Sequence, residues 1–186
     1  MTKINTYYGH TIDYNHPDPK EIDIRDIAHN LSFENRFIGK TEKPYSVAQH
    51  CVLGSYLFEK MGMPEFALQF LLHDAAEAYV KDIPTPLKRL LGEAYLTIET
   101  AFHHAIWTRF NLAPLAKEAI KAMDLLMLAA EKEQLLRSGN VPWTQLDGIK
   151  PPDIHIVPWQ PPQAEREYLA QFKKLTTLLE NEPWQE

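Results

Sequence analysis

The stretch Leu71-Leu72-His73-Asp74-Ala75-Ala76-Glu77 is the most informative in the chain, because it sets three ionisable side chains in an apolar helical segment. Adjacent helical positions lie about 100° apart and positions three or four apart share a face, so His73, Asp74 and Glu77 can address one pocket. An isolated ionised aspartate in apolar surroundings is unfavourable unless it is paired or bound to a metal. The motif alone is weak evidence, since a salt-bridged surface helix contains the same letters by chance.

Two further side chains strengthen the interpretation. His50 lies near the start of another amphipathic segment, and Asp124 lies between apolar residues of a third. Taken singly, a helical histidine is more often a hydrogen-bonded core residue, and Asp124 could simply pair with Lys121. Taken together with His73 and Asp74, they are harder to dismiss as structural.

Composition limits the class of protein. A length of 186 residues with 45% apolar and 24% charged residues fits one globular domain, residues 1–186, with its core at about residues 24–136. The net charge of −6 argues against a nonspecific nucleic-acid binder. No apolar run is long enough to span a membrane, residues 1–8 lack the pattern of a signal peptide, and Cys51 is the single cysteine. We therefore expect a cytoplasmic protein that contacts no membrane, with monomer and homo-oligomer both open.

Periodicity predicts an all-α helical bundle of five to six helices with a small N-terminal β-hairpin. Two short strands flank Gly9-His10, a pair suited to a type II′ turn. Ser46 and Gln49 form a capping box at the start of one helix. The expected helices cover about residues 24–31, 46–62, 64–84, 92–110, 114–137 and 163–179.

A proline-rich strap precedes the last expected helix. Residues 142–162 contain six prolines, which favours an extended segment. Its apolar side chains are too hydrophobic for free solvent, so we expect the strap to pack against the domain. These side chains are Trp143, Ile154, Ile156 and Trp159.

The order His50, then His73-Asp74, then Asp124 resembles the H…HD…D pattern of the HD-domain metal-dependent phosphohydrolases. The similarity covers about residues 24–136 and is greatest to small bacterial and phage enzymes that act on nucleotides, including 5′-deoxynucleotidases and deoxynucleoside triphosphate triphosphohydrolases. It does not extend to the proline-rich strap or the last helix. The similar segments are Asp26-Ile27-Ala28-His29, Asn35-Arg36-Phe37, Tyr45-Ser46-Val47-Ala48-Gln49-His50, Leu72-His73-Asp74-Ala75-Ala76-Glu77 and Asp82-Ile83-Pro84-Thr85-Pro86-Leu87-Lys88.

The resemblance implies one divalent metal ion held by His50, His73, Asp74 and Asp124. Mixed imidazole and carboxylate ligands suit Mn²⁺, Co²⁺, Ni²⁺, Fe²⁺, Zn²⁺ or Mg²⁺, and the sequence does not choose among them. The implied activity is hydrolysis of (deoxy)nucleotide phosphate esters by a metal-activated water, most simply as a 5′-nucleotidase releasing phosphate. Alternatives are a triphosphohydrolase releasing triphosphate and a catalytically silent nucleotide-binding protein.

Two acidic residues match catalytic positions of the resembled family. Glu77 would orient the water or carry its proton, and its alternative role is a surface salt bridge. Asp82 would act near the leaving group or sugar, which would explain a carboxylate at the unfavourable end of a helix. Glu131, seven residues after Asp124, would either orient a metal ligand or form a surface ion pair.

Three residues are candidates for binding substrate. Arg36 matches the phosphate-contacting arginine of the family, with an ion pair to Glu34 or Glu42 as the alternative. Phe37 could stack on a base or belong to the core. Lys88 could reach a phosphate or be an ordinary solvated lysine.

Overall fold

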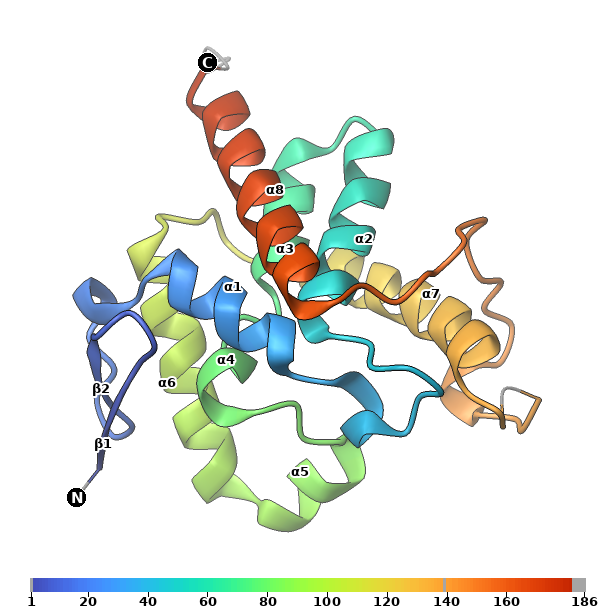
Figure 1. The fold of residues 1–186 in the computed structure, drawn as a ribbon, viewed down its shortest axis with the longest axis horizontal. Coiled ribbons are helices and arrows are strands. Elements are labelled where there is room, and N and C mark those ends of the chain that lie inside the picture. Colours follow the sequence, from blue (N-terminus) through green and yellow to red (C-terminus); the bar gives the residue numbers. More distant parts are fainter. Residues whose placement is uncertain (1, 139, 182–186) are drawn as a thin grey trace.

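The all-α class with a small hairpin is confirmed in the computed structural model, which describes residues 2–138 and 140–181 (Figure 1). Five of the six expected helices are present as single helices, the one expected over residues 64–84 is divided into α3 and α4, and the short α5 is additional among these residues. The helices are α1 (Ile24–Phe33), α2 (Val47–Lys60), α3 (Pro64–Leu72), α4 (Glu77–Val80), α5 (Thr85–Leu91), α6 (Glu93–Arg109), α7 (Lys117–Leu135) and α8 (Pro161–Asn181). The strands are β1 (Lys3–Asn5) and β2 (Thr11–Asp13).

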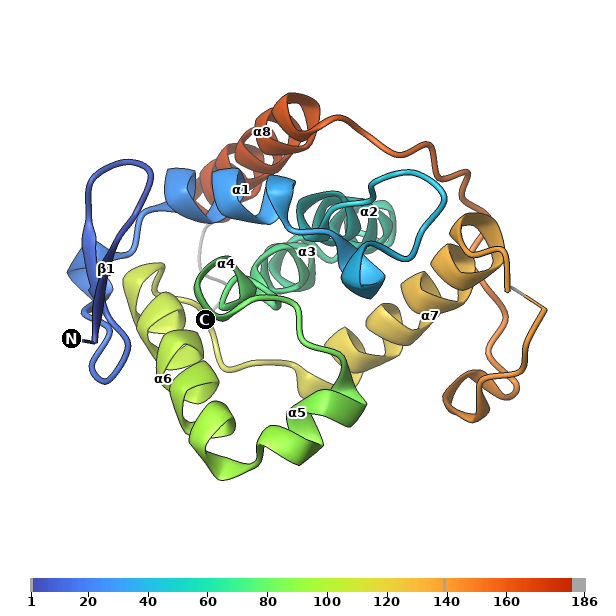
Figure 2. The ribbon, with the colours of Figure 1, turned by 60° about the horizontal axis from the view of Figure 1, so that its bottom comes forward.

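Helices α2 and α3 form the centre of the bundle. Both contact α7 and α8, and α1 packs on α2, α4 and α8. In Figure 2, α4 lies near the middle of the molecule, with α1, α5, α6 and α7 around it. The close approach of α2 to α3 depends on Gly54, because a Cβ atom added there would lie 2.1 Å from a ring carbon of the fully buried Phe70.

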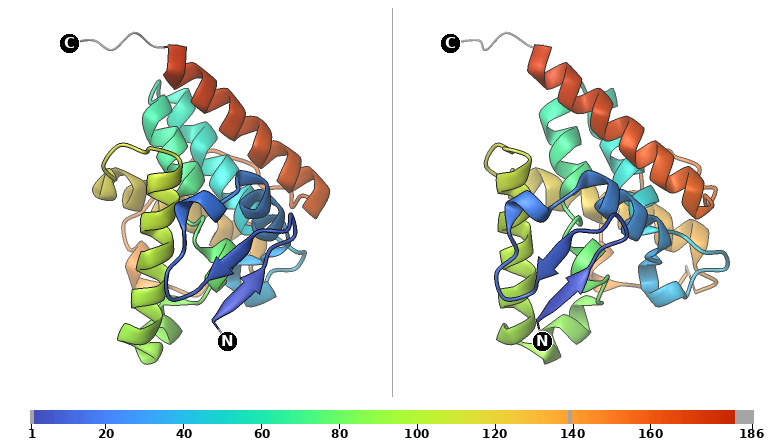
Figure 3. Two further views of the ribbon diagram at one scale, coloured as in Figure 1. Left: turned by 90° about the vertical axis from the view of Figure 1, so that its left-hand side faces the viewer. Right: turned by 60° about the vertical axis from the view of Figure 1, so that its left-hand side comes forward.

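The hairpin is confirmed, but the two-residue turn at Gly9-His10 is wrong. Strands β1 and β2 pair antiparallel with Asn5 opposite Thr11, so the connection spans residues 6–10. The buried carboxylate of Asp26 on α1 accepts hydrogen bonds from the Thr6 hydroxyl at 2.7 Å and the Tyr8 amide at 2.9 Å. The wider loop lets these two donors reach Asp26, which holds the hairpin against the bundle (Figure 3).

The single helix expected over residues 64–84 is also wrong, because the chain forms a tighter turn at His73-Asp74. Helix α3 ends at Leu72, and α4 begins at Glu77. Between them the amides bond three residues back, with Ala75 N to Leu72 O at 3.1 Å and Glu77 N to Asp74 O at 2.9 Å. Residues three apart lie directly above one another in such a turn, so Glu77 comes beside Asp74.

The predicted starts of α1 and α2 have side-chain caps, and α3 begins at Pro64 as expected without one. Asp23 accepts from the amide of Arg25 and caps α1, and Ser46 accepts from the amide of Gln49 and caps α2. Helix α7 begins at Lys117, three residues after the expected start at Pro114, and its start has no side-chain cap.

A capping box also predicts that the Gln49 side chain binds the backbone amide of Ser46. This part of the prediction is wrong, because the Gln49 side chain binds the strap instead. Its amide donates to Val157 O and accepts from Trp159 N, both at 2.8 Å. Gln134 on α7 forms an equivalent pair of hydrogen bonds with the strap. Its amide donates to Ile154 O and accepts from Ile156 N, both at 3.0 Å. Two glutamine side chains thus pair with the strap backbone as a neighbouring strand would.

Helix α8 completes the bundle. Its Tyr168 is fully buried and donates a hydrogen bond of 2.7 Å to the carbonyl of Leu71, two residues before His73. Among the residues described, no helix combines the length and the apolar character needed to cross a bilayer.

Candidate metal centre

His50, His73 and Asp74 are brought together as expected. His50 lies in the first turn of α2, and the other two lie in the tight turn after α3. Ligand atoms from all three lie within 4.8 Å of one another. Oδ2 of Asp74 lies 3.2 Å from Nε2 of His73 and 3.8 Å from Nε2 of His50.

Asp124 reaches the same place from α7. Its Oδ1 atom lies 3.6 Å from Nε2 of His50, while its Oδ2 atom accepts from Lys121 at 2.9 Å. The metal-ligand interpretation and the Lys121 alternative are therefore compatible, since each uses a different carboxylate oxygen.

The imidazole nitrogens that face the carboxylates have no hydrogen-bond partner among the described residues. These are Nε2 of His50 and Nε2 of His73, both buried. The opposite nitrogens donate, from Nδ1 of His50 to Glu131 at 2.6 Å and from Nδ1 of His73 to Phe70 O at 2.6 Å. In the neutral imidazoles the lone pairs consequently point at carboxylates, an arrangement that a cation bound between them would satisfy.

The pKa shifts of the clustered side chains also indicate that positive charge is favoured between them. Burial lowers the pKa of His73, but the adjacent Asp74 outweighs burial and raises it well above its ordinary value. Burial likewise raises the pKa of Asp74, and His73, His50 and Arg36 reverse this and lower it strongly. The residues therefore fit a bound divalent cation.

Glu131 binds His50 at Nδ1, the nitrogen opposite the one that faces the cluster. The alternative of a surface ion pair for Glu131 is wrong. It is fully buried. Its carboxylate accepts from His50, from the hydroxyl of Tyr45 at 2.9 Å and from Nε of Arg36 at 3.1 Å. Burial raises its pKa, but the positive charge of Arg36 and the contact with His50 give a net lowering, so it stays ionised.

Arg36 lies between Glu131 and the proposed ligands, with an Nη atom 3.5 Å from Asp74 Oδ2. The alternative ion pairs are wrong, because Glu34 pairs with Lys81 and Glu42 with Arg137. Arg36 is thus a buried cation held on one side by Glu131 and bordering the site on the other.

Glu77 is buried, so the surface salt bridge considered for it is wrong. Its Oε2 atom has no hydrogen-bond partner among the described residues, and its Oε1 atom lies 3.7 Å from Nζ of Lys88. Burial, followed by the charges of Asp74 and Asp82, raises the pKa of Glu77 well above its ordinary value. Burial also raises the pKa of Asp82.

Lys88 is not the solvated lysine of the alternative interpretation. Its ammonium group lies 2.6 Å from Glu99 on α6, and its side chain is only 23% exposed. Glu99 therefore positions Lys88 next to Glu77.

The proposed site opens into a cleft of about 740 Å³. Phe37 is half-buried and lines this cleft, so the alternative that it belongs to the core is wrong. The sequence pattern did not predict that Trp143 and Gln145 of the strap, or Arg89 of α5, would line the cleft. The site residues lining the cleft are Arg36, Phe37, Asp74, Glu77, Asp82, Lys88 and Asp124.

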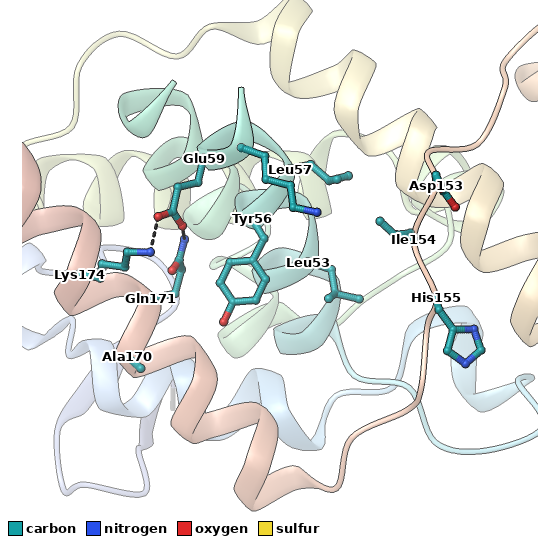
Figure 4. Close-up of a pocket in the computed structure, with 11 residues that line it drawn as sticks. Leu53, Tyr56, Leu57, Glu59, Asp153, Ile154, His155, Ala170, Gln171 and Lys174 are labelled. Carbon is teal, nitrogen blue, oxygen red and sulfur yellow. Dashed lines mark hydrogen bonds and ion pairs between the residues drawn. The ribbon is translucent and has the colours of Figure 1, made fainter. Parts of the chain in front are cut away.

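A second cavity of about 790 Å³ lies between α2, the strap and α8 (Figure 4). Its charged Glu59 is satisfied by Lys174 and by the amide of Gln171. None of the expected site residues lines it. The cavity is as large as the cleft, but it lacks the converging unpaired ligand atoms that mark the metal centre.

Comparison with known proteins finds relatives without an assigned activity. No protein-family model matches the chain. It is 37% identical over 179 residues to the uncharacterized protein YfdR of Escherichia coli, covering 96% of this chain and 98% of the relative. It is 39% identical over 137 residues to an uncharacterized protein of Rhodobacter capsulatus, covering 68% of this chain and 69% of the relative.

Proposed function

The chain belongs to the same protein family as YfdR of Escherichia coli, and we propose that it is a divalent-metal-dependent phosphohydrolase of the HD type that acts on nucleotides. One observation carries the proposal. Two buried imidazole nitrogens without partners, in His50 and His73, converge with the carboxylates of Asp74 and Asp124. This donor set suits a hard or borderline divalent cation.

The ion would be held by His50, His73, Asp74 and Asp124. When bound, a divalent cation acidifies water and polarises a phosphate oxygen, which is the chemistry that hydrolysis of a phosphate ester needs. Glu131 prepares His50 for this role, because its hydrogen bond fixes the proton on Nδ1 and leaves Nε2 free to bind.

The remaining polar groups of the cleft bind the phosphate, handle protons and compensate charge. Arg36 binds phosphate oxygens through the guanidinium nitrogens that Glu131 does not use. Burial and the charges of Asp74 and Asp82 raise the pKa of Glu77, and a bound divalent cation would lower it toward the ionised form, in which Glu77 would orient the attacking water and accept its proton. Asp82, whose pKa burial raises, holds a proton for the leaving oxygen as the P–O bond breaks. Lys88 compensates the negative charge beside Glu77.

The nucleotide is proposed as a 5′-monophosphate, from which the protein releases phosphate. Arg89 and Lys121 add two further cations to the lining of the cleft. These cations would also suit a longer phosphate chain, so release of triphosphate from a deoxynucleoside triphosphate is the second candidate.

Product analysis tests the proposal. The purified protein is incubated with each nucleoside mono- and triphosphate and with Mn²⁺ or Co²⁺, and the product is identified as phosphate or triphosphate. Asp124→Ala serves as the control for contaminating phosphatases, since it removes a proposed ligand. Phosphate release by the wild type and not by the variant supports the nucleotidase. A wild-type protein that releases neither product under these conditions would overturn the phosphohydrolase.

A further inference from the structure

Trp143 lies in the wall of the cleft, although its sequence context predicted packing against the domain. Its strap neighbours Ile154, Ile156 and Trp159 do pack against the two buried clusters of the core. Trp143 instead lines the same cleft as Arg36, and its ring centroid lies 6.4 Å from that of Phe37 with the planes tilted by 51°. The two rings form an aromatic corner.

Each ring of this corner has a cation over it. The guanidinium of Arg36 lies over Phe37, 5.6 Å from the ring centroid, and the ammonium of Lys132 on α7 lies over Trp143 at 5.8 Å. Cation–π contacts of this length favour a defined ring position. Because both rings also line the cleft, the surfaces not covered by the cations remain available to a ligand.

The backbone at Phe37 is strained in a way that core packing does not explain. Phe37 and Ile38 both adopt left-handed φ values, 58° and 53°, which cost energy for a β-branched residue such as isoleucine. The Ile38 side chain is 57% exposed, so its own burial offsets little of this cost. The conformation does place the Phe37 ring in the cleft immediately after the buried Arg36.

Helix α7 connects the proposed metal centre to the aromatic corner, so its rise gives the distance between them. Asp124, Leu128 and Lys132 follow one another at four-residue spacing and thus lie along one face of the helix. From Asp124 at the metal centre to Lys132 beside Trp143, the eight residues rise about 12 Å. This length suits a molecule with an anionic group at one end and a flat apolar group at the other.

We propose that the Phe37–Trp143 corner binds the base of a nucleoside phosphate, and that Trp143 is a specificity-determining residue which selects nucleoside phosphates over phosphate esters without an aromatic group. The inference rests on the proposed function, since it assumes that the phosphate lies at the metal centre. Stacking tolerates every base, so the corner recognises the presence of a base and not its identity. Gln145, on the same turn of the strap, offers an amide donor and acceptor for the base edge.

Kinetics with two substrates test the inference. Deoxyadenosine 5′-monophosphate carries a base, and ribose 5-phosphate is a sugar 5-phosphate without one. In Trp143→Ala we expect KM for the nucleotide to rise about 10-fold, the scale of a lost base–aromatic stack, with kcat little changed. KM for ribose 5-phosphate should stay at the wild-type value, and Trp143→Phe should restore most of the nucleotide affinity.

The matched control is Val141→Ala, which alters a half-exposed residue just before the strap that does not line the cleft. It should leave both substrates unchanged. If Trp143→Ala leaves the nucleotide KM unchanged, or raises both KM values equally, the assignment of the base site is overturned.

A binding measurement separates this inference from the proposed function. Calorimetric titration of the same variants with deoxyadenosine 5′-monophosphate and with ribose 5-phosphate requires no turnover. If the wild type hydrolyses neither compound, the 5′-nucleotidase fails, and the titration still decides the base site. Tighter binding of the nucleotide that is lost in Trp143→Ala and kept in Trp143→Phe supports the site, and equal affinities in all three proteins overturn it.

Discussion

Oε1 of Glu131 lies 2.6 Å from Nδ1 of His50, and neither side chain is exposed to solvent. The carboxylate can only accept, so this contact places the proton of a neutral His50 on Nδ1 and directs the lone pair of Nε2 toward Asp74 and Asp124. The same carboxylate holds Arg36. One buried acid thus positions both a proposed metal ligand and the proposed phosphate-binding group.

Glu131→Gln should weaken metal binding by about 10- to 100-fold, the usual effect of losing a group that orients a histidine ligand. Titration with Mn²⁺ or Co²⁺ followed by calorimetry measures the change. Glu133→Gln, an exposed substitution on the same helix, is the control and should bind metal normally. Unchanged affinity in Glu131→Gln would show that His50 needs no orientation.

Alanine at any one of His50, His73, Asp74 or Asp124 should lower metal content, because three ligands form an incomplete shell. Asp124→Ala is the most informative of these variants, since Asp124 comes from α7 and is half-buried at the edge of the cluster. Elemental analysis gives the metal content, and circular dichroism should show nearly unchanged helicity. Full metal occupancy with full activity in this variant would exclude Asp124 from the site.

Glu77→Gln should keep the metal and lose turnover by roughly 10²-fold or more, the scale of a missing acid–base group. The amide preserves the shape of the buried side chain but cannot accept a proton from water. Glu93→Gln, which is exposed on α6, is a control expected to act as the wild type. Wild-type turnover by Glu77→Gln would transfer the role of base to Asp82.

Arg36→Ala should weaken binding of a nucleotide and spare the corresponding nucleoside, because only the nucleotide offers phosphate oxygens to the guanidinium. The variant should also lose about 3–5 kcal/mol of stability, since it leaves the buried Glu131 without its cation. Arg36→Lys keeps the charge and separates the two effects. Calorimetry with both ligands, together with thermal unfolding, makes the comparison. Equal losses for nucleotide and nucleoside would argue against the phosphate contact.

Asp23 should make the protein sensitive to acid. The hydrogen bond from Arg25 lowers the pKa of Asp23 from its ordinary 3.8 to about 2. Its stabilising effect is therefore complete above the unfolded-state pKa near 4, and is lost as pH falls from about 4 to about 2. Urea unfolding over this range should show a shallower loss of stability in Asp23→Asn than in the wild type. Asp147→Asn, which is exposed on the strap, should follow the wild-type curve.

Local signals in the sequence predicted much of the fold. The caps at Asp23 and Ser46 act within three residues along the chain, so their effect can be read directly from the sequence. The ordered His50, His73-Asp74 and Asp124 also converge as expected. Convergence could be anticipated because the three apolar helical segments that carry them must pack against one another.

What the sequence did not reveal depends on contacts between distant residues. The tight turn at His73 differs from a helix only in which carbonyl each amide bonds to, and the two alanines in it, Ala75 and Ala76, favour a helix. Gln49 fits a capping box by its spacing, yet its partners lie 108 and 110 residues away. Trp143 has the same apolar character as Trp159, and only the tertiary position of the strap separates a residue of the cleft from a residue of the core.

The way in which Gln49 and Gln134 hold the strap bears on how this family can diversify. Both amides bind main-chain atoms, at Val157, Trp159, Ile154 and Ile156, and none of these hydrogen bonds depends on a strap side chain. Mutations at the cleft-lining positions 143 and 145 therefore leave this anchorage intact. Residues that line the cleft can therefore be exchanged while the segment stays in place and the proposed metal ligands on α2 and α7 are unchanged.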